Sequence, residues 1–385
     1  MKDTPAIQIA NRAPRIALLL PDLRGGGAER VGIELANEFS RRGFLVDMLL
    51  LQSEGELASQ LDAKVRVFNL RTSRTRFALL ALLSYLRRDR PAGLVANMWP
   101  LTVLAPVAAK LSGTPCRVLT VEHNAISNQY NGWGLIHRVL MRASLALGLR
   151  LADTRAGVSS GVADDVARLA KFPRDRIATL YNPVPSRLHV SEIALAHADR
   201  VWACPKGRRI ISVGSLKEQK NHRLLLRAFR DMGDDKAFLL ILGQGSLEAE
   251  LRTLAEELGI LRQVVFAGFY HDPTPFYATA DLFVLSSDYE GFGNVLVEAL
   301  GQGVPVVSTD CPSGPSEILA GGTYGTLVPP GDAEALAKAM GNALSIQHDR
   351  DLLRGRARHF GIDKAADAYL DTLLPGWRGQ QQVSS

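Results

Sequence analysis

The segment Glu290-Gly-Phe-Gly-Asn-Val-Leu-Val-Glu298 places two carboxylates eight positions apart around a glycine-containing turn. The preceding residues, Asp281–Ser287, form a short apolar run that is typical of a buried parallel strand. The pattern predicts that Glu290 lies on the loop after this strand and that Glu298 lies on the following helix. Unpaired N–H groups at a helix start favour an anion. A nucleotide-sugar, with hydroxyls at both ends and phosphates between them, fits this arrangement; two unrelated surface carboxylates are the alternative.

The length and composition indicate a two-domain protein with ordinary globular cores. The chain has 385 residues, of which 46% are hydrophobic and 22% charged. Its three cysteines, Cys116, Cys204 and Cys311, show no disulfide or metal spacing, and residues 1–15 lack the apolar core of a signal peptide. We therefore expect a cytoplasmic protein. The longest apolar run, Phe77–Leu83, is far shorter than the ~20 residues that span a bilayer.

Charge is divided unevenly along the chain. Residues 1–185 contain 25 Lys and Arg against 15 Asp and Glu, whereas residues 186–385 contain 20 against 24. A basic half suits nucleic acid, anionic lipid or a phosphorylated substrate. No recognisable nucleic-acid-binding motif accompanies the basic residues, so we expect no nucleic-acid partner.

Strand-like and helix-like segments alternate throughout the chain. This alternation predicts two parallel sheets with helices on both faces. The two prolines of Tyr181–Pro185 cannot belong to a central strand, so we place a domain boundary after this segment. The predicted domains are 1–185 and 186–360, and residues 361–385 contain an amphipathic stretch that could return to the first domain. Ligands of open parallel sheets bind beyond the carboxyl ends of the strands, so we expect the chemistry in a cleft between the domains.

Individual elements follow from the apolar runs. The predicted helices include Ala28–Arg41, Phe77–Arg90 and Leu135–Leu151. The predicted strands are Arg15–Leu20, Leu45–Leu51, Val65–Asn69, Gly93–Asn97, Arg117–Val121, Arg155–Val158, Arg209–Val213, Phe238–Leu242, Val264–Ala267, Leu282–Ser286, Pro305–Ser308 and Gly325–Val328.

Three further segments combine glycine with a helix start, which suits phosphate. Gly25–Gly27 let the backbone approach a ligand without a Cβ, although Arg30 stands where the dinucleotide fingerprint requires a third glycine. In Val213–Asn221, Lys220 stands just before a helix and could reach a diphosphate. Cys311–Glu317 opens another helix with Gly and Pro. A tight turn without a ligand is the alternative for the first segment, and Pro is common at a first helical position without a ligand, which is the alternative for the third.

His123 follows a predicted strand of the first domain, in Val121-Glu-His-Asn124. A histidine at the carboxyl end of a strand is a candidate for contacting the reacting group, and a structural histidine is the alternative. The sequence shows neither a Ser-His or Cys-His nucleophile arrangement nor a cluster with metal-ligand spacing.

Together these segments resemble the GT-B-fold glycosyltransferases of the retaining family 4 type, glycosyl transferases group 1, over essentially the whole chain. The run from Glu290 to Ile318 carries most of the resemblance, supported by GSLKEQKN at 214–221, ILGQGSL at 241–247 and AGF at 267–269. The resemblance implies an α/β architecture of two Rossmann-like, doubly wound domains facing across a cleft. The first domain would bind the acceptor and the second the nucleotide-sugar, with a UDP-sugar favoured. It also implies retention at the anomeric carbon and no metal or other cofactor.

The same resemblance assigns roles to individual residues. Glu298 would hold the ribose hydroxyls, while Glu290, Lys220 and His123 would act at the reacting centre. The family usually has Arg where this chain has Ser215. Either Lys217 or Arg24 replaces that cation, or the affinity for the diphosphate is lower. The implied donor-binding residues are Gly26, Gly27, Ser215, Lys220, Gly245, Phe269, Glu290, Phe292, Gly293, Asn294, Val295 and Glu298.

Other functions stay open at this point. An NAD-dependent oxidoreductase is opposed by the broken glycine fingerprint, although Asp47 lies twenty residues after Gly27. A nucleotide-sugar isomerase of the same fold and an inactive sugar-nucleotide-binding module are two more alternatives.

The basic first domain suggests the kind of acceptor. Arg74–Arg90 and Trp133–Leu151 combine long apolar faces with arginines, and Arg138 and Arg142 lie one turn apart. Ordinary core-facing helices are one interpretation. The other is peripheral attachment to an anionic membrane, at the inner face of the plasma membrane. It leads us to expect a lipid-linked glycan acceptor, as in assembly of bacterial surface polysaccharide or glycolipid.

Overall fold

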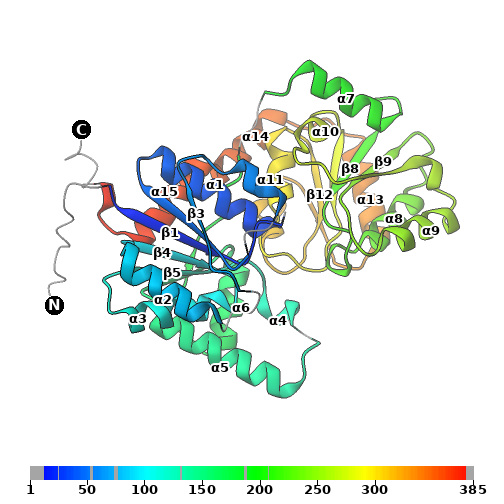
Figure 1. The fold of residues 1–385 in the computed structure, drawn as a ribbon. Coiled ribbons are helices and arrows are strands. Elements are labelled where there is room, and N and C mark those ends of the chain that lie inside the picture. The colour runs from blue at the N-terminus through cyan, green and yellow to red at the C-terminus, as the bar shows by residue number, and fades with distance from the viewer. Residues whose placement is uncertain are drawn as a thin grey trace. The chain divides into compact units, whose positions relative to one another are not determined.

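The computed structural model describes residues 13–24, 26–52, 55–72, 77–130, 132–185, 189–206 and 208–378. The chain divides into two compact units, each built on its own sheet (Figure 1). The first unit comprises Met1–Val158, Ala163–Pro183 and Ile362–Ser385, and the second comprises Ser159–Val162 and Val184–Gly361.

The first unit contains a seven-stranded sheet in the order β3-β2-β1-β4-β5-β6-β7, and all its strand pairs are parallel. The inner strands are buried on both faces, which explains their continuous apolar sequence. The strands are β1 (Arg15–Leu20), β2 (Leu45–Leu50), β3 (Arg66–Asn69), β4 (Gly93–Asn97), β5 (Arg117–Glu122), β6 (Thr154–Gly157) and β7 (Ala178–Thr179).

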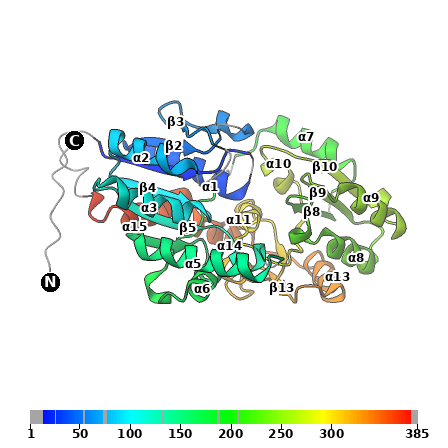
Figure 2. The same cartoon turned by 60° about the horizontal axis from the view of Figure 1, so that its bottom comes forward.

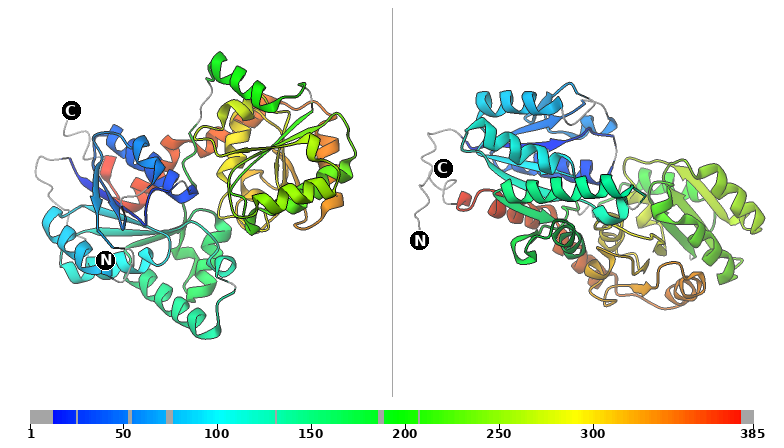
Figure 3. Two further views of the ribbon diagram at one scale, coloured as in Figure 1. Left: turned by 45° about the vertical axis from the view of Figure 1, so that its right-hand side comes forward. Right: turned by 90° about the horizontal axis from the view of Figure 1, so that it is seen from below.

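Helices cover both faces of this sheet (Figures 1 and 3). The helices α1 and α15 lie on one face, and α2 and α3 lie on the other, where they enclose a buried apolar cluster with β1, β2 and β4. The helices are α1 (Gly27–Arg41), α2 (Ala78–Asp89), α3 (Leu101–Ser112), α4 (Ile126–Gln129), α5 (Leu135–Leu151), α6 (Ser160–Ala170) and α15 (Ile362–Leu373).

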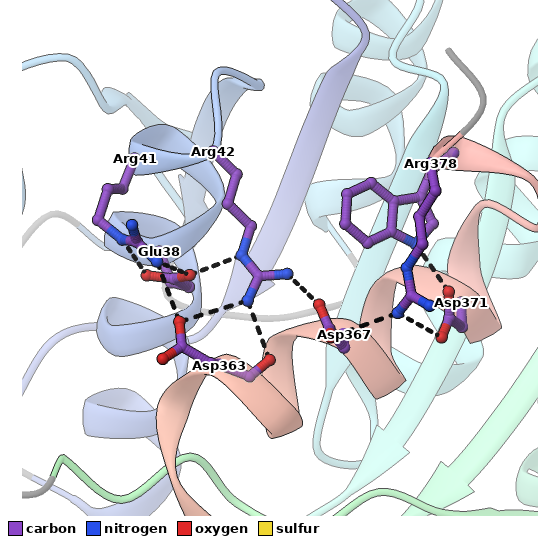
Figure 4. Close-up of polar contacts among 8 residues, drawn as sticks. Glu38, Arg41, Arg42, Asp363, Asp367, Asp371 and Arg378 are labelled. Carbon is purple, nitrogen blue, oxygen red and sulfur yellow. Dashed lines mark hydrogen bonds and ion pairs between the residues drawn. The ribbon is translucent and has the colours of Figure 1, made fainter. Parts of the chain in front are cut away.

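The last helix, α15, packs in the first unit although it follows the whole of the second in sequence. Leu373 is fully buried, and a Cβ on Gly93 would lie 2.7 Å from it, so a glycine at the start of β4 leaves room for this side chain. Arg42, which directly follows α1, donates to Glu38 at 2.6 Å and to the backbone oxygen of Asp363 at 2.9 Å (Figure 4). Its guanidinium also pairs with Asp367. Buried apolar contacts and an ionic network therefore both hold α15 against the first unit.

The second unit contains a six-stranded parallel sheet in the order β10-β9-β8-β11-β12-β13 (Figure 2). Its strands are β8 (Arg209–Val213), β9 (Phe238–Leu242), β10 (Val264–Gly268), β11 (Leu282–Leu285), β12 (Val306–Thr309) and β13 (Thr326–Val328). The helices of this unit are α7 (Glu192–Trp202), α8 (His222–Met232), α9 (Glu248–Glu257), α10 (Thr274–Ala278), α11 (Asn294–Gly301), α12 (Pro315–Ile318), α13 (Ala333–Ala343) and α14 (Arg350–Ala357).

The predicted fold class, two parallel α/β sheets, is confirmed. The strands β1, β4, β8 and β9 have the bounds expected from the sequence, and the other predicted strands differ by one residue at one or both ends. The prediction missed β7, whose two residues at the edge of the sheet are too few to give an apolar pattern.

The start of α6 belongs to the second unit, a feature that the sequence did not predict. The hydroxyl of Ser159 donates to the backbone oxygen of Gly291 at 2.6 Å. The carboxylate of Glu317 accepts from the backbone N–H groups of Ser160 and Gly161 at 2.9 and 3.3 Å. These bonds join residues that are far apart in sequence, so no local pattern marks them.

Candidate active site

In the second unit, the chemistry-bearing loops follow the neighbouring strands β8 and β11. The strand order runs outward in both directions from this pair, and ligands of open α/β sheets bind where the order reverses in this way. The loop after β8 contains Ser215 and Lys220, and the loop after β11 contains Glu290. The two predicted phosphate and carboxylate segments therefore lie at the same edge of one sheet.

Lys220 and Glu290 form an ion pair at this edge, with 2.6 Å between Nζ and Oε1. The same carboxylate oxygen accepts a hydrogen bond of 2.6 Å from the hydroxyl of Ser287. Both charged side chains are largely buried, with relative exposures of 15% and 7%. A partly dehydrated cation and carboxylate hold each other in place here without further ordering by a ligand.

Hydrogen bonds between the two loops fix this pair. The hydroxyl of Ser286 donates to the backbone oxygen of Lys220 at 2.9 Å, and the amide of Gln219 donates to the backbone oxygen of Tyr289 at 2.9 Å. The backbone N–H of Asp288 returns a bond of 2.9 Å to the backbone oxygen of Gln219. The loops are thus organised before any substrate binds.

Helix α11 begins directly after the Glu290 loop, as the sequence predicted. Gly293 caps it with φ of +100°, a left-handed conformation that favours glycine. The first-turn amides of such a helix suit an anion. The described structure thereby places Phe292, Gly293, Asn294 and Val295 at a helix start that lies next to Glu290 in sequence.

Glu298 lies on α11, and its position is set by a residue that the sequence analysis did not identify. The hydroxyl of Tyr277 donates to Glu298 Oε2 at 2.9 Å. Tyr277 belongs to α10, and its ring is almost completely buried against Phe283. A tyrosine in an apolar segment gives no sequence signal for this role.

Some predicted glycines serve packing. A Cβ on Gly245 would lie 2.2 Å from the backbone oxygen of Leu216, because the loops after β8 and β9 lie close together. A Cβ on Gly314 would lie 1.8 Å from the backbone oxygen of Phe292. Packing therefore explains Gly314, and the helix α12 that follows it has only one turn. The assignment of Cys311–Glu317 to phosphate stays a prediction.

Two cations were considered as replacements for the missing arginine, Arg24 of the first unit and Lys217 of the second. Ser215 is exposed, and Phe269 is half-buried with its ring 5.1 Å from that of His271. Of the two cations considered for the role, Arg24 pairs with Asp22 at 2.6 Å, whereas Lys217 is exposed two positions from Ser215.

In the first unit, His123 follows β5, and its Nε2 lies 2.9 Å from Asn97 Oδ1 at the end of β4. The Asn97 amide nitrogen donates to the backbone oxygen of Leu19, which orients its oxygen toward the histidine. Nε2 therefore carries the proton, and Nδ1 is a buried acceptor with no partner among the described residues. Burial lowers the pKa of His123 to about 4, so the ring is neutral at pH 7.

The glycine segment after β1 is described from Gly26 onward, and Gly25 lies outside the described residues. Gly26 caps α1, and a Cβ there would meet only the flexible side chain of Glu29. A Cβ on Gly27 would have no protein atom within 4 Å, and its φ is not in the left-handed region. Gly27 is exposed and its Cβ position is open, so packing does not require a glycine there. Its role in facing the ligand stays a prediction.

Glu122, directly before His123, is a second buried group that the sequence analysis did not single out. Its carboxylate accepts from the hydroxyl of Thr102 at 2.5 Å and from the backbone N–H of Trp99 at 3.0 Å. Burial outweighs these bonds and raises the pKa of Glu122 to about 7. The carboxyl group therefore changes charge near neutral pH.

The described residues include neither a candidate metal site nor a candidate membrane-spanning helix. They contain no group of three or more His, Cys, Asp or Glu side chains placed to hold a metal ion. None of their helices is long and apolar enough to cross a membrane.

The sequence matches two family models that fall on the two halves of the chain. Residues 25–187 match the model of glycosyltransferase family 4, and residues 200–360 match that of glycosyl transferases group 1. The chain belongs to the GT-B glycosyltransferases. The resemblance stated from the motifs is thereby confirmed, in preference to an oxidoreductase.

The chain is similar to several bacterial glycosyltransferases. It is 28% identical over 358 residues to the lipopolysaccharide core biosynthesis glycosyltransferase LpsE of Rhizobium meliloti, covering 91% of this chain and 96% of the relative. It is 29% identical over 257 residues, 65% of this chain and 66% of the relative, to an N-acetylgalactosaminyltransferase of Campylobacter jejuni whose name includes diphospho-undecaprenol. Among solved structures, Anabaena HepE in complex with UDP-glucose superposes with a TM-score of 0.72 at 19% identity, covering 96% of this chain and 98% of HepE.

The glycosyltransferase thus carries its predicted site residues as two groups. Lys220 and Glu290 form one group of the second unit with the start of α11 and with Glu298. His123 and the glycines before α1 follow β5 and β1 of the first unit.

Proposed function

We propose that this glycosyltransferase moves a sugar from a nucleotide-sugar to a hydroxyl group of a glycan acceptor, with retention at the anomeric carbon. The ion pair of Lys220 and Glu290 carries the proposal. It presents a cation and a carboxylate 2.6 Å apart at the edge where sheets of this kind bind ligands. A sugar diphosphate supplies the matching groups, an anion for the lysine and hydroxyls for the carboxylate.

The diphosphate would bind to Lys220 and to the first-turn amides at Phe292–Val295. These donors are fixed by the protein before the reaction and would stabilise the charge that develops on the departing diphosphate. That is the task a metal ion performs in other transferases, so we propose that no metal is required. A chelator should leave the rate unchanged.

The nucleoside would lie along α11. Glu298, held by Tyr277 at 2.9 Å, would accept hydrogen bonds from ribose hydroxyls, because a carboxylate has several acceptor sites. Gly245 and Phe269 would border the base. The complex of HepE with UDP-glucose supports UDP as the nucleotide.

The first unit would contribute the acceptor side and contacts to the transferred sugar. His123 Nδ1 is a neutral acceptor that lacks a partner among the described residues, and a sugar hydroxyl would supply the missing donor. The backbone at Gly26 and Gly27 would allow close approach of the sugar.

Retention requires that the new bond forms on the face from which the diphosphate departs. The carboxylate of Glu290 is bound by Lys220 and Ser287, which suits a hydrogen-bond acceptor better than a covalent nucleophile. We therefore propose same-face substitution. The bond from the anomeric carbon to the diphosphate oxygen breaks, the acceptor oxygen bonds to that carbon, and the acceptor proton passes to the departing phosphate oxygen.

The relatives support an acceptor in bacterial surface glycan assembly. Their names refer to lipopolysaccharide core and to a diphospho-undecaprenol-linked glycan. We propose a lipid-linked glycan acceptor of a surface polysaccharide or glycolipid.

A thermal-shift panel of nucleotide-sugars tests the donor, because a ligand that binds the native state raises its apparent stability. UDP-sugars should raise the melting temperature more than GDP- or ADP-sugars or NADH. Nucleoside diphosphate should then be released faster when the acceptor is added. Conversion of the nucleotide-sugar to an isomer without an acceptor would contradict the proposal.

A further inference from the structure

Helix α5 is apolar on the side that faces solvent as well as on the side that faces the protein. Met141, Leu145 and Leu149 are buried in the first unit. A helix that is apolar all round is normally covered on every side. On α5 the outer apolar residues have relative exposures of 47–74%; they are Leu135, Ile136, Val139, Leu140 and Leu147.

These outer residues form a continuous surface. They follow one another at helical spacing, and Ala143 is exposed between Leu140 and Leu147. Helix α3 packs between α2 and α5, so the three helices form one layer (Figure 3). Leu111 of α3 and Leu80 of α2 are further exposed apolar residues on helices of that layer.

The charges interspersed with this surface all have one sign. Residues 123–152 include Arg138, Arg142 and Arg150 but no Asp or Glu. The three arginines are exposed, and none forms an ion pair within the described part of the chain. We call the outer apolar residues of α5 together with these three arginines the α5 face. Its net positive charge complements an anionic surface.

Aromatic residues stand at the N-terminal end of the same helix. Trp133 is 37% exposed, and its ring lies 4.6 Å from Tyr130 and 5.8 Å from Trp99. Tryptophan and tyrosine are enriched where protein meets the headgroup level of a bilayer, because they combine an apolar body with a polar group.

We propose that the α5 face binds the headgroup region of an anionic bilayer, with the helix lying in the plane of the membrane surface. Apolar side chains would enter the acyl boundary while the arginines contact lipid phosphates, as in other interfacial amphipathic helices. A second copy of the chain fits less well, because a symmetric interface places each face against itself and brings arginines together. The proposal concerns attachment and does not rest on the transfer reaction.

Co-sedimentation of the full chain with vesicles tests the proposal. We expect binding to vesicles of phosphatidylcholine and phosphatidylglycerol at low salt, weaker binding at high salt, and little binding to phosphatidylcholine alone. Arg138→Gln with Arg142→Gln should lower the partition coefficient on anionic vesicles about tenfold or more, since each basic residue near the surface contributes about a kcal/mol. Ile136→Ser with Leu140→Ser should lower it as well, on the same vesicles.

Matched controls lie in the second unit. Ile193 is 81% exposed and Arg262 is exposed, so Ile193→Ser and Arg262→Gln remove the same kinds of side chain from another surface. Both should bind vesicles like the unmodified protein, and all variants should keep its melting temperature and its rate of donor hydrolysis. Equal vesicle binding by the α5 and control variants would overturn the proposal. The proposal would also be overturned if the unmodified protein bound no vesicles and formed a dimer that Ile136→Ser with Leu140→Ser converts to a monomer.

Discussion

The ammonium group of Lys220 lies 2.6 Å from Glu290 Oε1, so the cation proposed to bind diphosphate is already paired with the carboxylate proposed to bind the sugar. Lys220→Ala removes the diphosphate contact and leaves Glu290 with an uncompensated charge. We expect a loss of transition-state stabilisation on the order of 3 kcal/mol in kcat/KM, comparable to deleting one preorganised donor. Lys236→Ala, on an exposed position of the same unit, is the control and should keep full activity.

Replacing Glu290 and replacing Glu298 should have different effects on the kinetics and on donor binding. Glu298→Ala should weaken donor binding by roughly 1.5–3 kcal/mol, the size of hydrogen bonds to a charged group. Glu290→Ala should instead lower kcat more than donor affinity, since its contact is to the reacting sugar. Calorimetric donor titration and steady-state kinetics distinguish the two, and unchanged donor affinity in the Glu298 variant would remove its ribose assignment.

The hydroxyl of Tyr277 should influence donor affinity without touching the donor. Tyr277→Phe deletes its bond to Glu298 and should weaken donor binding by about 1 kcal/mol while kcat changes little. The control is Tyr324→Phe, because Arg356 contacts the ring of Tyr324. In the Glu298→Ala background, Tyr277→Phe should have no further effect on donor affinity; an additive loss would show that Tyr277 acts through another residue.

Ser215 stands where the family usually has a diphosphate-binding arginine, and Ser215→Arg puts that residue back. Ser215→Arg should tighten nucleoside-diphosphate binding, because Arg adds a bidentate phosphate donor. Calorimetry with UDP measures the gain, and Lys217→Ala in the same background shows whether Lys217 had compensated. No gain on adding the arginine would mean that another residue already supplies the charge.

The buried carboxyl of Glu122 should make stability depend on pH. Its folded-state pKa of about 7 lies above the ordinary 4.5, so its contribution to stability is full below pH 4.5 and is lost as pH rises through 7. Glu122→Gln cannot ionise; its amide oxygen can accept from the backbone N–H of Trp99 while its NH2 group donates to the hydroxyl oxygen of Thr102. The unmodified protein should therefore lose stability relative to this variant between pH 4.5 and 8, by on the order of 3 kcal/mol. Urea unfolding at several pH values measures the difference, and a constant difference would contradict the buried titration.

The fold was predictable because parallel strands buried on both faces are continuous apolar runs. The run at Phe238–Leu242, for example, has the same bounds in the structure. The Glu290 loop was predictable because a strand, a glycine turn and a helix follow one another in sequence. The roles of Tyr277 and Glu122 were not predictable, because they depend on contacts between distant segments and on burial. Gly245 and Gly314 show why a glycine in the sequence can be assigned to a ligand when it serves packing. A glycine needed for packing has the same sequence pattern as one that faces a ligand.

The placement of α15 has a consequence for synthesis on the ribosome. Residues 362–373 complete the first unit, yet they emerge only after the whole second unit has been made. Until then β4 and β5 lack the helix that packs against them, so apolar strand surface is exposed for the time needed to translate about half the chain. The second unit has no such delay and can fold as soon as its own residues are available. A chain that stops before residue 362 would therefore contain a finished second unit and an unfinished first unit, and aggregation should begin at the uncovered strands.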